Sequence, residues 1–398
     1  MEFDMVDNAA LGTVIKVVGV GGAGGNAVQH MINKGVSGVE FIAANTDAQA
    51  LAVSGAHNII QIGESGLGAG MRPEVGRQLA EQTRSRIEDS LRGAHMVFIA
   101  AGMGGGTGTG AAPIVAEVAK MMGALTVAVV SKPFSYEGQK CMDIAEAGLE
   151  ELSKHVDSLI IILNEKLEDI YEDESMLDWM KHADDVLNNA VAGIAEIINV
   201  PGHINVDFND VKTIMSEQGK AMMGTATASG VDRARLAAEQ AVASPLLDGI
   251  DLSGAKGVLV NVTASRGLKG KEIKEVMAAV RAFAAPDASI AQGIAYDDAM
   301  GDEIRVTVVA TGLGKAKKIQ LVQPQQVLRT GTYNAPMMGG ATTLTAGLTQ
   351  GHVSGGGNEG MKQPAVWRRE QASEQVRAMQ NNGVETYDIP AFLRKQAD

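Results

Sequence analysis

The sequence has only one cysteine, Cys141, in 398 residues, so no disulfide can form within the chain. It also lacks the basic start and long apolar stretch of a secretory signal, because residues 1–7 are acidic. Its apolar runs, such as Met96 to Ala101, are far shorter than the roughly 20 residues of a membrane-spanning helix. We therefore expect a cytoplasmic protein that reaches a membrane only through a partner.

Aromatic residues are scarce, at 4% of the chain, and the net charge is -13 with no dense run of Lys or Arg. Proteins that bind duplexes neutralise phosphates with basic side chains, and those that bind single strands stack bases on aromatic rings. Nucleic acid is therefore not an expected partner. The GxxxxGK[ST] motif is missing too, which excludes the phosphate lysine of P-loop NTPases.

What the sequence does contain is an alternation of short β-branched runs with longer helical patterns between Thr13 and Leu163. This alternation is typical of a parallel sheet covered by helices on both faces. We therefore predict an α/β fold that begins with a Rossmann-like parallel-sheet domain over residues 1–177. Its expected strands are Val14 to Val18, Val39 to Ala43, Met96 to Ala101, Leu125 to Val130 and Leu159 to Leu163.

Apolar residues between Asp178 and Val200 recur at spacings of three and four, which predicts a long buried helix. A Pro-Gly pair ends it, so we treat residues 178–202 as a central helix. Residues 203–314 are predicted to form a smaller α+β domain. Its expected elements are strands at Gly257 to Ala264, Ile290 to Tyr296 and Glu303 to Thr311, and a helix at Lys271 to Phe283.

The end of the chain changes character twice. Residues 315–384 are rich in Gln, Gly and Thr with little periodicity, which is the composition of a flexible, disordered linker. Residues 385–398 regain apolar side chains, among them Ile389 and Phe392. These side chains are present either by chance or as a short C-terminal peptide that docks in a partner's groove.

A first glycine loop, Gly19 to Gly24, follows the first expected strand and matches GxGxxG. Asp47 comes at the end of the second expected strand, where a dinucleotide enzyme holds a ribose hydroxyl. The motif alone is weak, and an NAD-dependent oxidoreductase is one interpretation of it.

A second glycine loop, Gly104 to Gly110, lies between a strand and a helix. Its bare backbone N–H groups and the positive helix end converge on one anion, and Thr107 and Thr109 add hydroxyl groups. Glycine clusters also serve tight turns, but two such loops on one sheet edge favour nucleotide phosphates. A third glycine segment runs from Gly66 to Pro73, and it is placed to close over a terminal phosphate with Arg72 as the cation.

An acidic loop, Asn205 to Asp210, follows the central helix. Asp207 is expected near the cap of a helix and Asp210 in its first turn. One interpretation is ordinary helix capping. The other is that Asp207 and Asp210 polarise a water molecule that Asn205 helps to orient.

Taken together, these segments resemble the FtsZ family, the bacterial cell-division homologues of tubulin, over nearly the whole chain. GGGTGTG at Gly104 to Gly110 is similar to the tubulin-family signature loop, and NVDFNDV at Asn205 to Val211 to the family's synergy loop. NTDAQAL from Asn45, GLGAG from Gly66, PEVG from Pro73 and DIPAFLRKQAD from Asp388 support the match.

The resemblance implies a GTPase that polymerises head to tail into the filaments of the cell-division ring. Asn205, Asp207 and Asp210 of one subunit would complete the nucleotide site of the next. Glu137 matches the family's ribose contact and Asp184 its guanine reader. The implied GTP or GDP site consists of Gly21, Gly22, Ala23, Gly24, Gly25, Asn26, Asn45, Ala69, Gly70, Arg72, Gly104, Gly105, Gly106, Thr107, Gly108, Thr109, Gly110, Glu137, Cys141, Asn164, Met180 and Asp184.

The resemblance also implies Mg²⁺ held mainly by the nucleotide phosphates, with K⁺ as an additional ion, and no metal site made by protein side chains alone. Residues 385–398 would bind membrane anchors and regulators such as FtsA, ZipA and MinC, at a mid-cell division site in the cytoplasm.

The chain departs from the family inside the nucleotide pocket. Cys141 stands where an arginine is usual, Met180 where an aromatic residue commonly stacks on guanine, Leu163 where a proline is usual, and Arg72 where an asparagine is usual. A charge-assisted contact of the kind that the usual arginine makes at the position of Cys141 contributes roughly 1.5 to 3 kcal/mol. Arg72 would offset the loss of this contact. Our hypothesis is a working GTPase with altered nucleotide affinity or turnover, and the alternative is a divergent non-ring or weakly hydrolysing paralogue that regulates the division filament.

Overall fold

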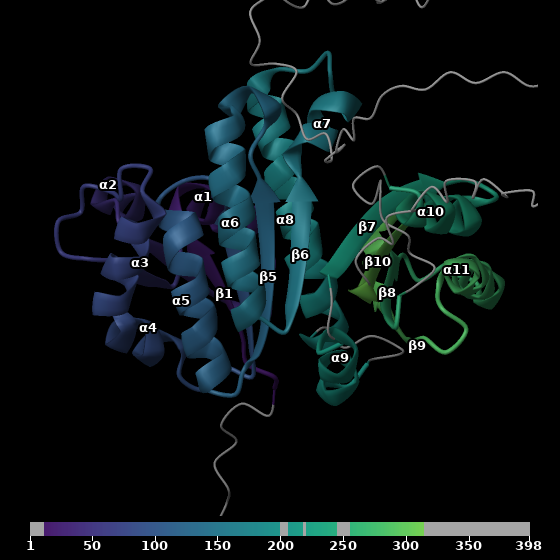
Figure 1. Ribbon diagram of the computed structural model, residues 1–398. Coiled ribbons are helices and arrows are strands. Elements are labelled where there is room, and N and C mark those ends of the chain that lie inside the picture. The colour runs from purple at the N-terminus through teal and green to yellow at the C-terminus, as the bar shows by residue number, and fades with distance from the viewer. Residues whose placement is uncertain (1–11, 200–205, 218–219, 245–254, 314–398) are drawn as a thin grey trace, which may run out of the picture. The chain divides into compact units, whose positions relative to one another are not determined.

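The computed structural model describes residues 12–199, 206–217, 220–244 and 255–313 (Figure 1). These residues contain one sheet of ten strands, in the order β3-β2-β1-β4-β5-β6-β7-β10-β8-β9. The predicted linker at 315–384, the terminal peptide at 385–398 and Asn205 lie outside the described residues. In the part of the chain that is described, no helix has the length and apolar character to cross a membrane.

The first six strands of the chain are parallel to their neighbours, as predicted. They are β1 (Ile15–Val20), β2 (Glu40–Asn45), β3 (Asn58–Gln61), β4 (Met96–Gly102), β5 (Leu125–Lys132) and β6 (Ser158–Leu163). Five of them were expected from their β-branched runs, and their ends agree within two residues. Every residue of β1 is buried, because helices cover both faces of this part of the sheet.

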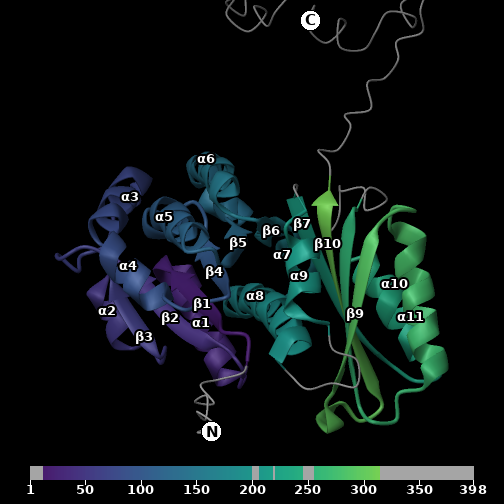
Figure 2. The same cartoon turned by 90° about the horizontal axis from the view of Figure 1, so that it is seen from below.

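Two helix layers cover the parallel strands, and they lie on opposite sides of the sheet in Figure 2. Successive side chains of a strand point to opposite faces, so Val17 and Val18 of β1 belong to different buried clusters. Val17 packs with α1 (Gly21–Asn33) and α8 (Met176–Asn199). Val18 packs on the other face, in a cluster to which α3 (Pro73–Gln82), α4 (Arg84–Leu91), α5 (Thr107–Met121) and α6 (Gln139–His155) all contribute.

The remaining strands form the smaller α+β region. β10 (Glu303–Leu313) is antiparallel to β7 (Lys220–Ser229) and to β8 (Gly257–Ala264), and β8 is parallel to β9 (Ser289–Tyr296). α10 (Arg233–Val242) and α11 (Gly270–Phe283) share one buried cluster with these strands. The strands and the helix that the sequence predicted here are present, whereas β7 and α10 were not predicted.

The central helix α8 connects the two regions. It has 24 residues and therefore spans about 36 Å. It begins at Met176, slightly before the predicted start, and α9 (Phe208–Met215) lies near its far end (Figure 1). The predicted α/β fold, a parallel-sheet domain joined by a long helix to a smaller α+β region, is thus confirmed.

Candidate functional site

The two glycine loops meet at the carboxyl ends of β1 and β4. The first loop leads directly from Val20 into α1, whose first residue, Gly21, has a φ of +75°. A Cβ at Gly21 would lie 2.9 Å from the backbone nitrogen of Gly108 in the second loop. Both the left-handed backbone and this close approach favour glycine. The structure therefore brings together the two loops that the sequence assigned to one edge of the sheet.

The second loop folds back onto the first turn of α5. Gly104, with a φ of +104°, donates its N–H to Oγ1 of Thr109 at 2.9 Å, and this bond is buried. Oγ1 of Thr107 lies 2.6 Å from Oγ1 of Thr46, just after β2. The first N–H groups of a helix have no partners within it and carry the positive end of its dipole. The loop and the start of α5 therefore form a cradle suited to an anion.

The glycines of the cradle fall into two groups, according to whether a side chain added at each position would meet other atoms. At Gly24, Gly108 and Gly110, a Cβ would overlap a backbone carbonyl oxygen of a neighbouring segment. At Gly22 and Gly105, nothing lies within 4 Å of a Cβ, and both residues are exposed. Close packing explains the first group. It does not explain the second, whose bare backbone leaves room for a ligand.

The third glycine segment lies against the second loop. A Cβ at Gly106 would lie 2.8 Å from the backbone nitrogen of Arg72 and 3.0 Å from Cβ of Ala69. Gly70 has a φ of +60°, and Arg72, which is exposed, is the N-cap residue of α3. The predicted phosphate cation is therefore carried by a segment that touches the cradle.

Asn45 is the last residue of β2, and Asp47 follows two residues later. Asp47 is the N-cap residue of α2 (Ala48–Ala52), and its Oδ1 accepts the N–H of Gln49 at 2.8 Å. Asn45 is buried, and its Oδ1 accepts the N–H of Asp47 at 3.3 Å. Asp47 therefore serves as a helix cap, which accounts for it without a ribose. Asn26 is exposed on α1, next to the open glycines.

Two of the expected nucleotide contacts, Glu137 and Asn164, differ in their surroundings. Glu137 ends a 3-10 turn and accepts the N–H of Phe134 at 2.9 Å. Asn164 begins α7 (Asn164–Ile170) and lines a cavity of about 320 Å³ together with Gly138. The side-chain oxygen of Asn164 is buried and has no hydrogen-bond partner among the described residues. Such an acceptor is suited to a donor supplied by a ligand.

Asp184 lies on α8, and its burial raises the pKa of its carboxyl to about 6. The neighbouring carboxylate, Asp185, is held by α1, because its Oδ1 lies 2.7 Å from Nε2 of His30 and 3.2 Å from Nζ of Lys34. Sequence reasoning did not find His30 or Lys34. The two ends of the His30 contact are 155 positions apart in the chain, so no local pattern could reveal it.

The aromatic residue beside Met180 is already engaged within the protein. Nε1 of Trp179 donates to the carbonyl oxygen of Tyr171 at 2.7 Å, and its ring stacks on Phe134 at a centroid distance of 6.2 Å. Met180 is 44% exposed. Trp179 therefore joins α8 to the segment that carries Glu137, and Met180 is left as the exposed neighbour.

The acidic loop has the local geometry that the sequence predicted. Asp207 is the N-cap residue of α9, and its Oδ1 accepts the N–H of Asp210 at 2.8 Å. Asp210 lies in the first turn, and both side chains are exposed. Capping uses one oxygen of Asp207. The exposed carboxylate of Asp210 takes no part in the capping bond, which uses only the backbone N–H of that residue.

The cradle and the acidic loop are far apart within one chain. Asp184 is the ninth residue of α8, whereas α9 follows the end of that helix, and the 15 residues of α8 after Asp184 span about 22 Å (Figure 1). The acidic loop therefore lies away from the cradle of its own chain. The two halves can act together only if they come from different copies of the chain.

Comparison with protein families gives two matches. Residues 14–172 match the Tubulin/FtsZ family, GTPase domain, and residues 219–314 match the FtsZ family, C-terminal domain. The cell division protein FtsZ of Pseudomonas aeruginosa is 50% identical over 403 aligned residues, which cover 100% of both chains.

Solved structures agree with these matches. An empty FtsZ dimer from M. jannaschii is 43% identical, with a TM-score of 0.72, over 75% of this chain and 88% of that chain. CetZ2 from Haloferax volcanii, described as a GTPγS-bound protofilament, is 21% identical with a TM-score of 0.65, over 77% of this chain and 95% of that one. At that identity, the second likeness is informative about the fold alone.

Proposed function

Because this chain belongs to the FtsZ family of tubulin-like GTPases, we propose that it hydrolyses GTP where the acidic loop of one subunit docks on the nucleotide of the next. The chain is a GTP-dependent protein of cell division that assembles into filaments. The separation of the cradle from the acidic loop, which follows the far end of α8, is the observation that carries the proposal. A head-to-tail contact of this kind does not close on itself, so it builds filaments.

The residues present fit a guanine nucleotide. The open glycines Gly22 and Gly105 leave the backbone accessible to phosphates, and the N-terminus of α5 supplies the positive end of a dipole. The unpaired buried oxygen of Asn164 and the carboxylate of Asp184 supply acceptors. Guanine offers N1–H and N2–H₂ as donors to a carboxylate, and adenine offers no such pair. We assign the ribose to Glu137.

Asp207 and Asp210 act on the neighbouring subunit's nucleotide. In the proposed contact, Asp210 holds and polarises the attacking water, and Asp207 fixes the first turn of α9 through its capping bond. Asn205 would orient the same water, although it lies outside the described residues. Hydrolysis then weakens the contact that made it possible.

Mg²⁺ is proposed to bind the nucleotide phosphates rather than a protein cage. Within the described ranges, no group of three or more His, Cys, Asp and Glu side chains is placed to hold a metal ion. Mg²⁺ usually keeps several waters and binds through substrate phosphates, where it neutralises their charge. K⁺ at the phosphates is part of the same proposal.

Action at a mid-cell division site in the cytoplasm, and binding of FtsA, ZipA and MinC to residues 385–398, are proposed from family membership and from the apolar residues of that peptide. The oxidoreductase interpretation is excluded by family membership, and Asp47 serves as a helix cap. A weakly hydrolysing paralogue would keep the fold but show little phosphate release.

Release of phosphate from GTP, measured against protein concentration together with sedimentation of filaments, tests the proposal. Specific activity is expected to rise steeply with concentration, because each active site needs two subunits. Activity that stays flat with concentration would contradict a shared site. In an equilibrium titration with GTP, Arg72→Asn is expected to bind GTP more weakly and Cys141→Arg more tightly, and unchanged binding in both would reject compensation by Arg72.

The raised pKa of Asp184 makes GTP binding sensitive to acid. The carboxylate form accepts the guanine donors, and it is lost as the pH falls through about 6. GTP affinity is therefore expected to be constant above neutral pH and to fall, by up to about tenfold per pH unit, below pH 6. Equilibrium titration with GTP between about pH 5 and about pH 8 measures this dependence.

Two variants distinguish the contribution of Asp184 to this pH dependence from the contribution of the groups around it. Asp184→Asn is expected to bind GTP weakly at every pH, with the acid-dependent part removed. His30→Gln removes the imidazole that faces this region from α1, next to Lys34 and Asp185. An acid dependence that persists in Asp184→Asn but disappears in His30→Gln would assign the titration to the imidazole and reject the role of Asp184.

A further inference from the structure

The phosphate loop is supported from behind by α6. The support begins at the buried hydrogen bond in which Gly104 donates its N–H to Oγ1 of Thr109. Thr109 is 4% exposed, so its hydroxyl is turned inward and serves the loop. Without this acceptor, the N–H of Gly104 would be buried and unpaired, which a folded chain avoids. The shape of the loop therefore depends on the rotamer of Thr109.

The rotamer of Thr109 is set by a glycine on α6. A Cβ at Gly148 would overlap Cγ2 of Thr109 and would lie 2.8 Å from Cε of Met103. The methyl group of Thr109 thus occupies the space that a side chain at Gly148 would need. Threonine has few allowed rotamers, so seating the methyl group against Gly148 directs the hydroxyl toward Gly104.

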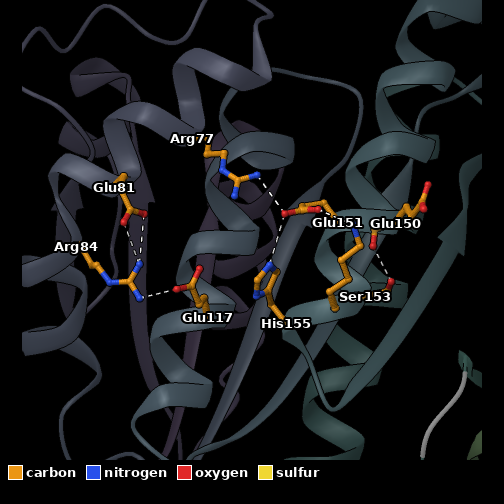
Figure 3. Close-up of polar contacts among 9 residues, drawn as sticks. Arg77, Glu81, Arg84, Glu117, Glu150, Glu151, Ser153 and His155 are labelled. Carbon is orange, nitrogen blue, oxygen red and sulfur yellow. Dashed lines mark hydrogen bonds and ion pairs between the residues drawn. The ribbon is translucent and has the colours of Figure 1, made fainter.

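An ion pair joins α6 to α3 close to Gly148. Glu151, one turn after Gly148, binds Nη1 of Arg77 on α3 at 3.1 Å and lies 3.6 Å from Nε2 of His155 (Figure 3). α3 in turn is packed on α5, because a Cβ at Gly110 would lie 2.7 Å from the backbone nitrogen of Arg77. The three helices α3, α5 and α6 therefore hold one another in place around the start of α5.

A second ion-pair group strengthens the same layer. Nη2 of Arg84, on α4, binds Glu117 of α5 at 2.8 Å, and Nη1 binds Glu81 at 3.1 Å (Figure 3). Exposed pairs of this kind contribute little each, so their effect here is to limit movement between helices rather than to stabilise the fold strongly. A side chain at Gly148 would press first on Thr109, whose Cγ2 is the nearest atom to a Cβ at that position.

We propose that Gly148 is a positioning residue for GTP hydrolysis: it seats the methyl group of Thr109, whose hydroxyl fixes Gly104 and so aims the N–H groups of the phosphate loop. This inference rests on the proposed GTPase function and adds a residue that does not touch the nucleotide. According to this proposal, residues on the side of the cradle that faces away from the ligand also determine phosphate binding.

Four proteins test the proposal: the unaltered chain, Gly148→Ala, Thr109→Ser, and the double variant. Gly148→Ala is expected to bind GTP about tenfold more weakly, because its methyl group turns Thr109 away from Gly104. Thr109→Ser keeps the hydroxyl and removes the methyl group that seats it, so it is expected to weaken GTP binding by about threefold, less than Gly148→Ala does. The double variant is expected to recover the affinity of Thr109→Ser, because the overlap is gone.

Two further variants serve as controls. Thr109→Val keeps the shape that fits against Gly148 but removes the acceptor, and it is expected to match the loss in Gly148→Ala. Gly270→Ala also changes a helical glycine, at a place where nothing lies within 4 Å of a Cβ, and is expected to bind normally. A double variant no better than Gly148→Ala alone would overturn the proposal, as would normal binding in Gly148→Ala.

Amide hydrogen exchange of the Gly104 N–H in nucleotide-free protein gives a readout that does not depend on activity. Exchange is expected to be faster in Gly148→Ala and in Thr109→Val, and near normal in Thr109→Ser and the double variant. Unchanged exchange in Gly148→Ala would overturn the positioning role. If the unaltered chain neither binds nor hydrolyses GTP, the proposed function fails instead, and this exchange pattern still reports on Gly148.

Discussion

Mixing Asp210→Asn with Gly105→Asp is expected to restore GTP hydrolysis that neither variant shows alone. Asp210→Asn keeps the nucleotide cradle but loses the water-polarising carboxylate. Gly105→Asp keeps the acidic loop but places a negative side chain in the open part of the cradle, where phosphates would bind. A contact between the two variants in one orientation contains an intact cradle and an intact acidic loop.

The expected activity of the mixture follows from the head-to-tail arrangement of subunits in the filament. If equal amounts mix at random in a head-to-tail polymer, about one contact in four joins the two intact halves. Phosphate release from the mixture should therefore approach a quarter of the activity of the unaltered chain. Neither variant can restore activity within a single chain, because each chain carries only one intact half of the site.

Matched controls test whether the loss of activity in Asp210→Asn comes only from the removal of a negative charge or from a failure to fold. Asp287→Asn removes an exposed carboxylate elsewhere in the α+β region and is expected to keep full activity. Asp210→Asn alone should still bind GTP with normal affinity, measured by equilibrium titration. If the mixture stays inactive while both variants enter filaments, hydrolysis does not use a site shared between subunits.

The elements that could be predicted from sequence are those whose local pattern agrees with their burial. The runs that became β1 and β4 are rich in apolar residues, and the period of α8 matches its buried face. β7 was missed because KAMMGTATAS consists mainly of small residues around Gly224. It is a strand because it pairs along β10, and that is a tertiary effect.

The candidate site divides in the same way. The glycine loops were expected to lie together, since parallel strands end at one edge, and the structure places Gly21 against Gly108. Which glycines serve packing and which leave space could not be predicted, because it depends on the oxygen atoms that surround them. The contact of His30 with Asp185 and the engagement of Trp179 by Phe134 likewise join segments distant in the chain.

The two interpretations of Asp207 were not separated by its geometry. Its Oδ1 does cap α9, as the simple interpretation expected. The capping bond nevertheless fixes the turn that carries Asp210, so one contact serves both interpretations. Only the position of α9 beyond the end of α8 supports the proposal that the loop acts on another subunit.

Substituting alanine at Gly105 and at Gly108 is expected to change stability in opposite directions while weakening GTP binding in both. At Gly105, a Cβ meets nothing within 4 Å and the backbone φ is not in the left-handed region. Alanine there reduces the freedom of the unfolded chain, which stabilises nucleotide-free protein by about 0.4 to 1 kcal/mol. The same methyl group occupies space left for phosphate, so GTP affinity is expected to fall at least about tenfold.

At Gly108, a Cβ would overlap the carbonyl oxygen of Gly102 and would lie 3.5 Å from that of Val20. Forcing a methyl group into packed backbone costs about 1 to 3 kcal/mol, more than the gain from the unfolded chain, so the net effect is destabilising. Denaturant unfolding without nucleotide, followed by GTP titration, measures both quantities. A destabilised Gly105→Ala would contradict the open space at that position. If instead Gly105→Ala is stable and binds GTP normally, the phosphates do not approach this part of the cradle, and the glycine there has no role in binding.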